Sequence, residues 1–166
     1  MHTQRAANIV GAFATTLGDR LAERSHLIVE HGASAPAALA AAANYDALSI
    51  ERLRRILGLS HPGAVRLVDR LQADGLLERR RGADGRTVNL ALTDRGRTRA
   101  KQLFAEREAV VTDALAGLKR KERAKVVDLL GRLLDATIDE TPQAESTCRL
   151  CRHKACAKSG GCPIAA

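Results

Sequence analysis

Apolar and polar positions along residues 48–95 predict two short helices followed by a hairpin. The first helix is expected over Ile50–Leu57, with Ser49 as its cap and Gly58 at its end. A serine hydroxyl accepts a hydrogen bond from a free backbone N–H at a helix start, and glycine tolerates the positive φ that ends many helices. Ser60 is expected to cap the second helix in the same way, so only a tight turn separates the two.

The second helix carries an apolar face and a polar face. At 100° per residue, its apolar positions fall on one stripe and its polar and basic positions fall opposite. The apolar stripe holds Ala64, Leu67, Val68 and Leu71, and the opposite face holds Gly63, Arg66, Asp69, Arg70 and Ala73. Two helices joined by a tight glycine-containing turn, the second with a free polar face, are typical of a helix-turn-helix that enters the major groove of DNA.

A basic hairpin follows this pair of helices. Leu76–Arg81 and Thr87–Leu92 are expected to form two strands, joined by the glycine-bearing loop Gly82–Arg86. The arginines around its tip are Arg79, Arg80, Arg81 and Arg86. Guanidinium groups in such a position neutralise phosphates or enter a narrow minor groove, so the hairpin is interpreted as a wing.

Long helices are predicted on both sides of this unit. They cover Asn8–Glu30, Ala35–Asn44, a stretch from the cap Thr93 to about Leu118, and about Lys121–Ile138. The last helix is too apolar to be covered by a small monomer, so we expect it to form an intersubunit bundle together with the N-terminal helix. An intramolecular pack of three helices is the alternative, because helices pack by the same rules within and between chains.

Length and charge favour one DNA-binding domain with a short appendage. The 166 residues suit a domain over residues 1–140, with its DNA-binding unit at about 48–95, and a tail over residues 141–166. The net charge of +8 and the seven arginines between residues 78 and 99 favour a polyanionic partner. A merely soluble basic protein is the alternative on charge alone. The chain has few aromatic residues (Phe 2, Tyr 1, Trp 0), which argues against nucleic-acid binding by base stacking.

No segment of the sequence is expected to enter a membrane. No apolar run approaches the roughly 20 residues of a membrane-spanning helix, and no N-terminal segment combines a basic start with an apolar core. We therefore expect a cytoplasmic protein. The run Ala35–Ala43 is too short to span a bilayer and is interpreted as a buried helix.

Residues 48–97 resemble the MarR family of winged-helix transcription regulators. The resemblance rests on LSIERLRRILGLSHPGAVRLVDRLQADGLLERR at residues 48–80, on the Asp84-Gly85-Arg86 wing tip, on the return strand, and on LTDRGR, which opens the next helix. In element order it covers residues 8–138. It implies a mainly helical winged helix-turn-helix protein and an obligate homodimer, whose outer helices interlock and whose recognition helices occupy the two halves of palindromic double-stranded DNA.

The same resemblance implies which residues lie nearest the DNA. On the recognition helix these are Ser60, His61, Gly63, Ala64, Arg66 and Arg70. In the wing, Arg86 matches the arginine of the family's D-x-R motif, and Arg80 and Arg81 complete the predicted DNA-binding set. The chain is therefore expected to be a transcriptional regulator, and a repressor is the favoured kind.

All four cysteines lie within fifteen residues near the C-terminal end, spaced C-x2-C-x4-C-x5-C. In a cytosolic chain such clustering indicates metal or redox chemistry rather than a disulfide framework. The predicted metal ligands are Cys148, Cys151, Cys156 and Cys162. Three alternatives stay open: an iron–sulfur cluster, favoured by Cys162-Pro163 as in ferredoxin ligand runs, a Zn²⁺ ion, and metal-free thiols that oxidise to disulfides.

The sequence predicts a binding protein rather than an enzyme. It holds no Ser/His/acid set, no phosphate-cradling glycine loop and no pair of carboxylates in an apolar setting. A thiol–disulfide oxidoreductase using Cys148 and Cys151 is the rival class, but no strand-rich redox fold precedes this CxxC motif. Among regulators, two versions remain: a tail that senses redox or metal state, and a purely structural zinc tail in a regulator that responds to a small-molecule effector.

Overall fold

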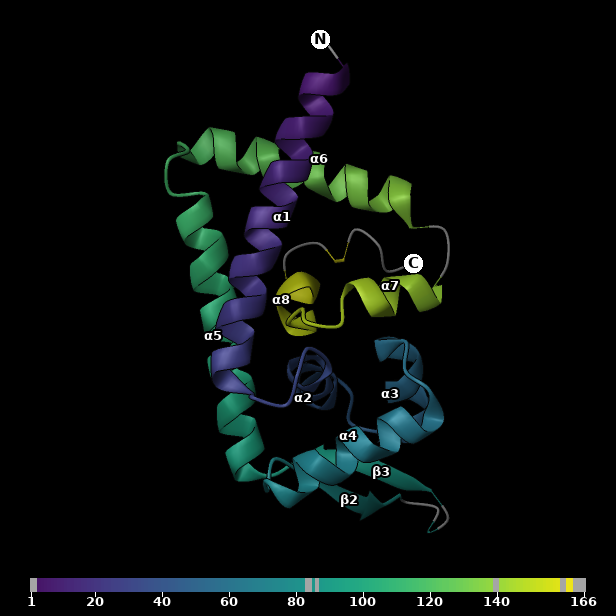
Figure 1. Cartoon of the computed structure of the whole chain (residues 1–166). Coiled ribbons are helices and arrows are strands. Elements are labelled where there is room, and N and C mark those ends of the chain that lie inside the picture. Colours follow the sequence, from purple (N-terminus) through teal and green to yellow (C-terminus); the bar gives the residue numbers. More distant parts are fainter. Residues whose placement is uncertain (1–2, 83–84, 86, 139–140, 159–160, 163–166) are drawn as a thin grey trace.

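A computed structural model describes residues 3–82, 85, 87–138, 141–158 and 161–162. In this part of the chain the elements are α1 (Thr3–Ile28), α2 (Ser34–Asn44), β1 (Leu48–Ser49), α3 (Ile50–Leu57), α4 (His61–Ala73), β2 (Leu77–Arg81), β3 (Val88–Leu92), α5 (Asp94–Ala114), α6 (Arg120–Thr137), α7 (Thr141–Thr147) and α8 (His153–Lys158). Figure 1 shows the β2–β3 wing at one end of the molecule and α6 at the other. The predicted mainly helical fold with a small antiparallel wing is confirmed.

The wing belongs to a sheet with one more strand than the sequence predicts. Its order is β1-β3-β2, and both pairings are antiparallel. β2 and β3 pair from Leu77 with Leu92 to Arg81 with Val88, while β1 pairs Leu48 with Leu90. β1 is only two residues long, so it carries no alternating pattern that could have predicted it.

Three predicted helix caps are confirmed. The Ser49 hydroxyl accepts from the Arg52 N–H at 3.1 Å at the start of α3, and the Ser60 hydroxyl accepts from the Gly63 N–H at 3.2 Å at the start of α4. Thr93 caps α5 in the same way. Gly58 ends α3 with φ of +63°, the left-handed conformation that glycine adopts without strain.

Gly96 lets α5 approach the wing closely. A Cβ at this position would lie 2.0 Å from the Leu76 carbonyl oxygen, so only glycine fits. Thr93, three residues earlier, donates its hydroxyl to the Gly75 carbonyl at 2.5 Å and accepts from the Gly96 N–H at 3.0 Å. The start of α5 is therefore fixed to the turn that precedes β2.

The apolar core lies in the winged half of the molecule. Leu39 on α2, Leu53 on α3, Leu71 on α4 and Leu90 on β3 are fully buried in one cluster. The interpretation of residues 35–43 as a buried helix is confirmed for residues 35–41. By contrast α6 has no buried residue, and Ser25 is the one buried residue of α1. Burying one leucine contributes about 1.5–3 kcal/mol, so this core is what fixes α4 and the wing.

Some predicted helix ends are wrong by a few residues. α1 begins at Thr3 rather than Asn8, and α5 ends at Ala114 rather than near Leu118. Residues 115–118 form turns instead, in which the Leu118 N–H donates to the Leu115 carbonyl at 3.1 Å.

The chain becomes helical again shortly after α6. α6 ends at Thr137, and Pro142 lies in the first turn of α7, where the missing N–H removes no intrahelical hydrogen bond. The tail thus contains two short helices, α7 and α8, around the cysteines. No helix in the described ranges is long and apolar enough to cross a membrane.

Candidate nucleic-acid interface and cysteine cluster

The recognition helix α4 turns its basic residues toward solvent. Its buried side is the predicted stripe of Ala64, Leu67, Val68 and Leu71. Arg66 and Arg70 are exposed on the other side, and Ser60 and His61 are exposed at the start of the helix. The two-faced pattern predicted from the spacing is therefore confirmed.

Ala64 is a correction to the predicted DNA-facing set. Its exposed fraction is 0%, because it lies three and four residues before Leu67 and Val68 on the packed stripe. The Ala64 side chain therefore belongs to the core. Gly63, next to it, is half-exposed, and a Cβ there would lie 3.1 Å from the Ser60 Oγ that caps the helix.

The charges on the polar face of α4 are not all paired within the part of the chain that the structure describes. Asp69, the acidic residue of the polar face, is bound by Arg79 of β2, with Nη2 and Oδ1 2.7 Å apart. Arg66 and Arg70 make no ion pair within the described part of the chain. An exposed guanidinium that no carboxylate neutralises is free to pair with a phosphate or a base edge.

The predicted wing arginines differ in their surroundings. Arg79 also donates to Gln72 of α4, so it braces the wing against the recognition helix. Arg80 pairs with Glu78 on its own strand, and Arg81 is exposed without an ion pair among the described residues. Arg86 lies outside the described residues, so its predicted DNA contact stays a prediction.

Hydrogen bonds close the base of the wing loop. The Gly82 N–H donates to the Thr87 carbonyl at 2.8 Å, and the Gly85 N–H donates to the Gly82 carbonyl at 2.9 Å. Gly85 has φ of +67°, which glycine adopts without strain. The wing loop therefore begins directly after Arg81, at the last residue pair of the two strands, Arg81 with Val88.

Other arginines of the basic segment are structural. Arg95 donates to the Asp74 carbonyl at 2.9 Å, and Arg97 donates to the Leu92 carbonyl at 2.7 Å. The Asp74 carboxylate at the end of α4 pairs with His31 from the loop after α1. In the sequence, the seven arginines of residues 78–99 form one basic cluster. These contacts show that Arg95 and Arg97 hold α4 and α5 in place.

The cysteine thiols gather around α7 and α8. The Sγ atoms of Cys148 and Cys162 lie 3.8 Å apart. Burial, followed by the neighbouring Cys151 and Cys162 thiols, raises the pKa of Cys148 from 9.0 to about 12. Burial also raises the pKa of Cys156, and Cys162 and Cys151 add to that effect. Cys148 and Cys156 therefore each lie within electrostatic reach of both Cys151 and Cys162.

The thiols are close together but are not arranged as a closed metal site. In the described part of the chain, no group of three or more His, Cys, Asp or Glu side chains has the geometry to hold a metal ion. The four cysteines are half-buried and free rather than joined in disulfides. Tetrahedral Zn–S bonds of about 2.3 Å place sulfur atoms about 3.8 Å apart. The Cys148–Cys162 pair meets that spacing. The donor type, four thiols, therefore suits a thiolate-bound metal, whereas the geometry of the full set is not that of a formed site.

Polar contacts fasten the tail to α2 and α3. Asn44 Nδ2 donates to the Cys151 carbonyl at 2.9 Å, and Asn44 Oδ1 accepts from the His153 N–H at 3.2 Å. Arg52 Nη2 binds Glu145 Oε1 at 2.6 Å. These contacts join residues about a hundred positions apart, so no local sequence signal predicts them.

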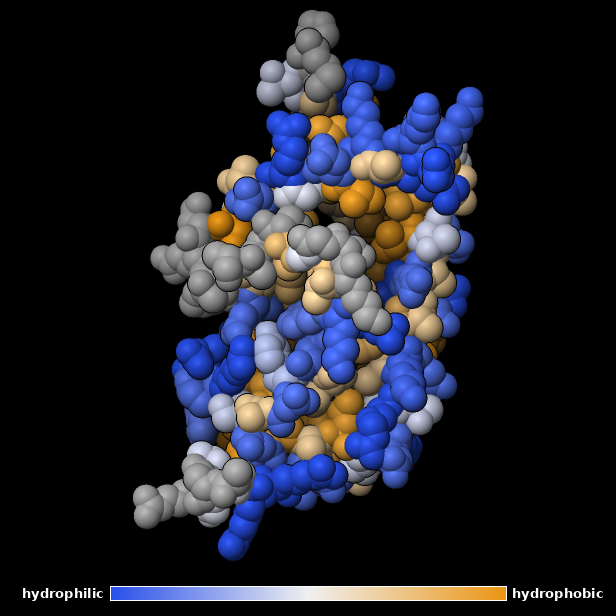
Figure 2. All heavy atoms as spheres, turned by 180° about the vertical axis from the view of Figure 1, so that it is seen from behind, coloured by the Kyte–Doolittle hydropathy of each residue, from blue (hydrophilic) through white to orange (hydrophobic). Residues whose placement is uncertain are grey.

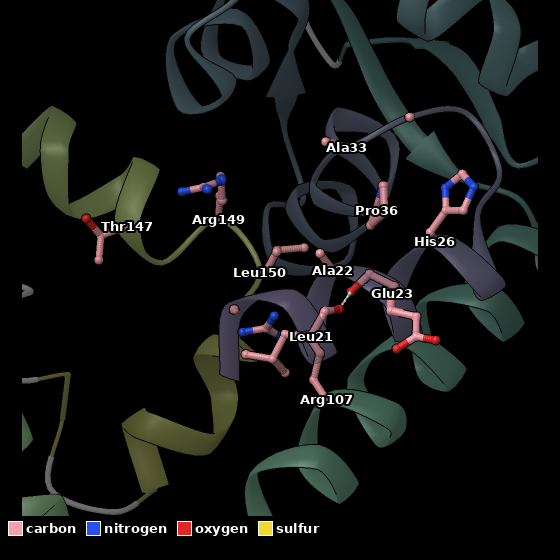
Figure 3. Close-up of a pocket in the computed structure, with 13 residues that line it drawn as sticks. Leu21, Ala22, Glu23, His26, Ala33, Pro36, Arg107, Thr147, Arg149 and Leu150 are labelled. Atoms are coloured by element: carbon pink, nitrogen blue, oxygen red, sulfur yellow. Dashed lines mark hydrogen bonds between the residues drawn. The ribbon is translucent and has the colours of Figure 1, made fainter. Parts of the chain in front are cut away.

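A cavity of about 600 Å³ lies between α1, α2, α5 and the tail (Figure 3). Its lining includes Leu21, His26, Pro36, Arg107, Arg149 and Leu150. Burial lowers the pKa of Arg107, yet a guanidinium stays charged in proteins. Arg107 and Arg149 outweigh the one carboxylate of the lining, Glu23, so the cavity has a net positive charge that suits a small organic anion. Sequence reasoning missed this cavity because its walls come from four separate segments.

Comparison with known sequences connects the winged half to one family. Residues 34–87 match the sequence model of the MarR family. The HTH-type transcriptional regulator YdgJ of Bacillus subtilis (strain 168) is 28% identical over 89 residues, which are 53% of this chain and 54% of that protein. The match therefore spans about half the length of this relative.

Comparison with solved structures extends the likeness to the fold as a whole. RV1404 from Mycobacterium tuberculosis has a TM-score of 0.73 at 20% identity, over 84% of this chain and 97% of that chain. YusO from Bacillus subtilis has a TM-score of 0.69 at 18% identity, over 82% and 99%. A MarR family protein from Bacillus stearothermophilus gives the same values. The chain therefore has the same winged-helix fold as these solved structures.

Proposed function

We propose that this chain is a MarR-family transcriptional regulator that binds palindromic double-stranded DNA as a homodimer. Each subunit places α4 in the major groove and the wing against the neighbouring phosphates and minor groove. Repression is the simplest output, since a dimer seated on a promoter excludes other proteins from the same duplex. The proposed function involves no enzymatic reaction.

The observation that carries this function is the exposed charge of Arg66 and Arg70 on the second helix of a helix-turn-helix, which no carboxylate of the described residues pairs. The core holds the opposite side of α4, and Arg79 neutralises Asp69, so the polar face has a net positive charge. A fixed basic helix face beside a basic wing matches the charge and the width of the major groove.

Apolar side chains left open on two helices support the homodimer. Phe13 on α1 is 45% exposed, and on α6 Val127 is 60% exposed and Leu133 58% exposed. Figure 2 shows apolar surface open to solvent around the end of the molecule where α6 lies. A contiguous exposed apolar surface of this kind is typical of a subunit interface. A second copy of the chain is the occupant that exposed apolar side chains on both α1 and α6 suit best.

A DNA titration tests the proposed function. The probe is the duplex that the wild-type protein enriches from a randomised library. Arg66→Ala and Arg70→Ala should each weaken binding by about 1–3 kcal/mol where the side chain reads a base, and by less, with a shallower salt slope, where it touches phosphate. Arg120→Ala, an exposed arginine at the start of α6, is the matched control for lost charge. Unchanged affinity and salt slope in both α4 variants would contradict the proposed docking.

The proposal extends to the tail, as a thiolate-bound metal centre that senses redox or metal state. Its support is the gathering of Cys148, Cys151, Cys156 and Cys162 together with the 3.8 Å spacing of one thiol pair. A bound iron–sulfur cluster supplies redox chemistry, and a bound Zn²⁺ supplies a structural cross-link. In either case the residues' role is to hold thiolates in one geometry.

Colour and metal content distinguish these two forms. Protein purified without oxygen should absorb at about 400 nm or above if it holds iron and sulfide, and should be colourless with about one zinc per chain otherwise. The Cys148→Ser/Cys151→Ser double variant is the control, and it should lose the metal in both cases. A wild-type chain that binds neither metal with all four thiols reduced would leave oxidation to disulfides as the remaining chemistry.

The cavity favours a second candidate function, a response to a small organic anion. Arg107 and Arg149 line it, and its volume is that of a small-ligand site. Thermal shift assays with a set of small carboxylates test this candidate. Stabilisation of the wild type that disappears in Arg107→Met supports it, and equal stabilisation of both proteins contradicts it.

A further inference from the structure

We infer that the cysteine tail controls the helix-turn-helix through a latch formed by Asn44, Tyr45, Arg52, Glu145 and His153. The latch transmits the state of the four thiols to α3, and α3 transmits it to α4. This inference rests on the proposed metal centre and names the residues through which that centre acts. The latch residues are positioning residues, since their action on DNA passes through other groups.

Asn44 joins the end of α2 to the loop between the cysteines. Its one amide group donates to the Cys151 carbonyl at 2.9 Å and accepts from the His153 N–H at 3.2 Å. Cys151 is itself a predicted ligand, so a metal held by its sulfur fixes the residue whose carbonyl Asn44 binds. The hydrogen bonds to Asn44 therefore report whether the loop has its metal-bound geometry.

Arg52 joins α3 to the same tail. Its guanidinium binds Glu145 of α7 at 2.6 Å and lies 3.9 Å from the centre of the Tyr45 ring. The Tyr45 ring in turn meets the His153 ring edge-on, with centres 5.3 Å apart and planes at 82°. One side chain of α3 is thus held by both ends of the cysteine loop, by α7 on one side and by His153 through Tyr45 on the other.

Movement of α3 cannot leave α4 unchanged, because the two helices form one packed unit. Leu53 and Ile56 of α3 are buried in the core with Leu67 and Leu71 of α4. A short turn connects the helices, in which the Leu59 N–H donates to the Arg54 carbonyl at 3.0 Å. A rigid connection of this kind carries a change at the latch to Arg66 and Arg70.

The fastening of the tail is conditional on the state of the thiols. No tail side chain in the described part of the chain is fully buried, so core packing does not hold it. With the thiols free, the latch contacts must order a loop of many residues, and the entropy lost opposes them. With a metal on Cys148 and Cys151, that loop is already ordered and the latch closes at lower cost.

The experiment measures hydrogen exchange of the α3 and α4 amides in the full-length protein, with thiols reduced, in metal-stripped and metal-loaded forms. Loading uses Zn²⁺ alone in one arm and Fe²⁺ with sulfide, without oxygen, in the other. In the wild type, loading should slow exchange in α3 by about fivefold or more, the lower range of allosteric coupling. The variants are Asn44→Ala and Glu145→Gln, and metal content is measured in every sample.

The matched control is Glu51→Gln. It removes an ion pair of the same 2.6 Å length on the same helix, between Glu51 and Arg54, that does not touch the tail. The inference predicts that Asn44→Ala and Glu145→Gln still bind the metal but lose the response of α3, whereas Glu51→Gln keeps it. Glu145→Gln keeps the test decisive if Asn44→Ala does not fold.

Failure of the inference and failure of the metal centre are distinguishable. If no metal binds in either arm, the metal centre and the latch inference are both wrong. Two results would contradict the latch inference while the metal centre stands. In the first, metal binds but exchange in α3 of the wild type does not change. In the second, metal loading changes exchange in α3 of both latch variants as much as in the wild type. Because exchange is read without DNA, neither result depends on the proposed operator binding.

Discussion

The winged unit at residues 48–97 and the cysteine tail at residues 141–162 are held in place in different ways. The winged unit has its own caps, its own sheet and a core that includes Leu53, Leu71 and Leu90. The tail has no fully buried side chain among its described residues, and its ties run to Asn44 and Arg52, about a hundred positions earlier.

This difference separates a permanent part of the molecule from a conditional one. A cooperative core keeps one geometry under most conditions, and so it presents Arg66 and Arg70 reliably. A segment held by a few polar contacts opens easily, which is the property a sensor needs. The predictions below test this contrast, beginning with the largest expected effect.

Leu71→Ala should lower the free energy of unfolding by about 2–5 kcal/mol, because it leaves a cavity in the core of the winged unit. Chemical denaturation measures it, and the loss should not depend on protein concentration. Leu133→Ala on α6 is the control, since its side chain is exposed in the subunit. The Leu133→Ala effect should vary with concentration, because it acts through the dimer. A small loss for Leu71→Ala would end the contrast between the two regions.

Gly96→Ala should destabilise the protein by about 1–3 kcal/mol, since the new Cβ would overlap the Leu76 carbonyl oxygen, which lies 2.0 Å from it. Thermal unfolding detects this change. Gly117→Ala, where nothing lies within 4 Å of the added Cβ, should be nearly neutral. Equal stability of the two variants would show that the close approach of α5 to the wing is not required.

Ser60→Ala should lower the free energy of unfolding by about 1 kcal/mol, because the Gly63 N–H loses its cap. Ser60→Asp restores a capping oxygen and should recover most of that stability. It should still weaken DNA binding, since it adds a negative charge at the start of the recognition helix. If Ser60→Asp binds DNA as tightly as the wild type, the start of α4 does not face the phosphates.

Glu145→Gln should have the smallest effect, at most about 1 kcal/mol on global unfolding. The side chains of Arg52 and Glu145 are 37% and 25% exposed, and ion pairs so accessible to water contribute little. Limited proteolysis should nevertheless cut the tail faster in this variant, since its attachment is local. A large loss of global stability would place the tail within the cooperative core.

Sequence periodicity predicted the winged unit well because its determinants are local. Caps at Ser49, Ser60 and Thr93, and the apolar stripe of α4, lie within a few residues of the structure that they specify. Ala64 was assigned to the DNA side by family resemblance although the same stripe placed it inside, and its burial shows that the physical pattern was the better guide.

The rest of the site depends on contacts that no local pattern contains. The pairing of β1 with β3, the brace from Arg79 to Asp69 and the bonds of Asn44 all join separate segments. The cysteine spacing predicted that the thiols gather, but neither α7 and α8 nor the docking of the tail on α3 follows from that spacing. Arg86 and the metal identity stay predictions.

The most direct test of the central claim is the number of chains bound per duplex, measured by sedimentation of the wild-type protein with its selected DNA over a series of salt concentrations. The account predicts two chains on each duplex, with an affinity that falls linearly on a logarithmic salt scale as phosphate contacts release counterions. One chain per duplex, or no binding at the lowest salt, would contradict it.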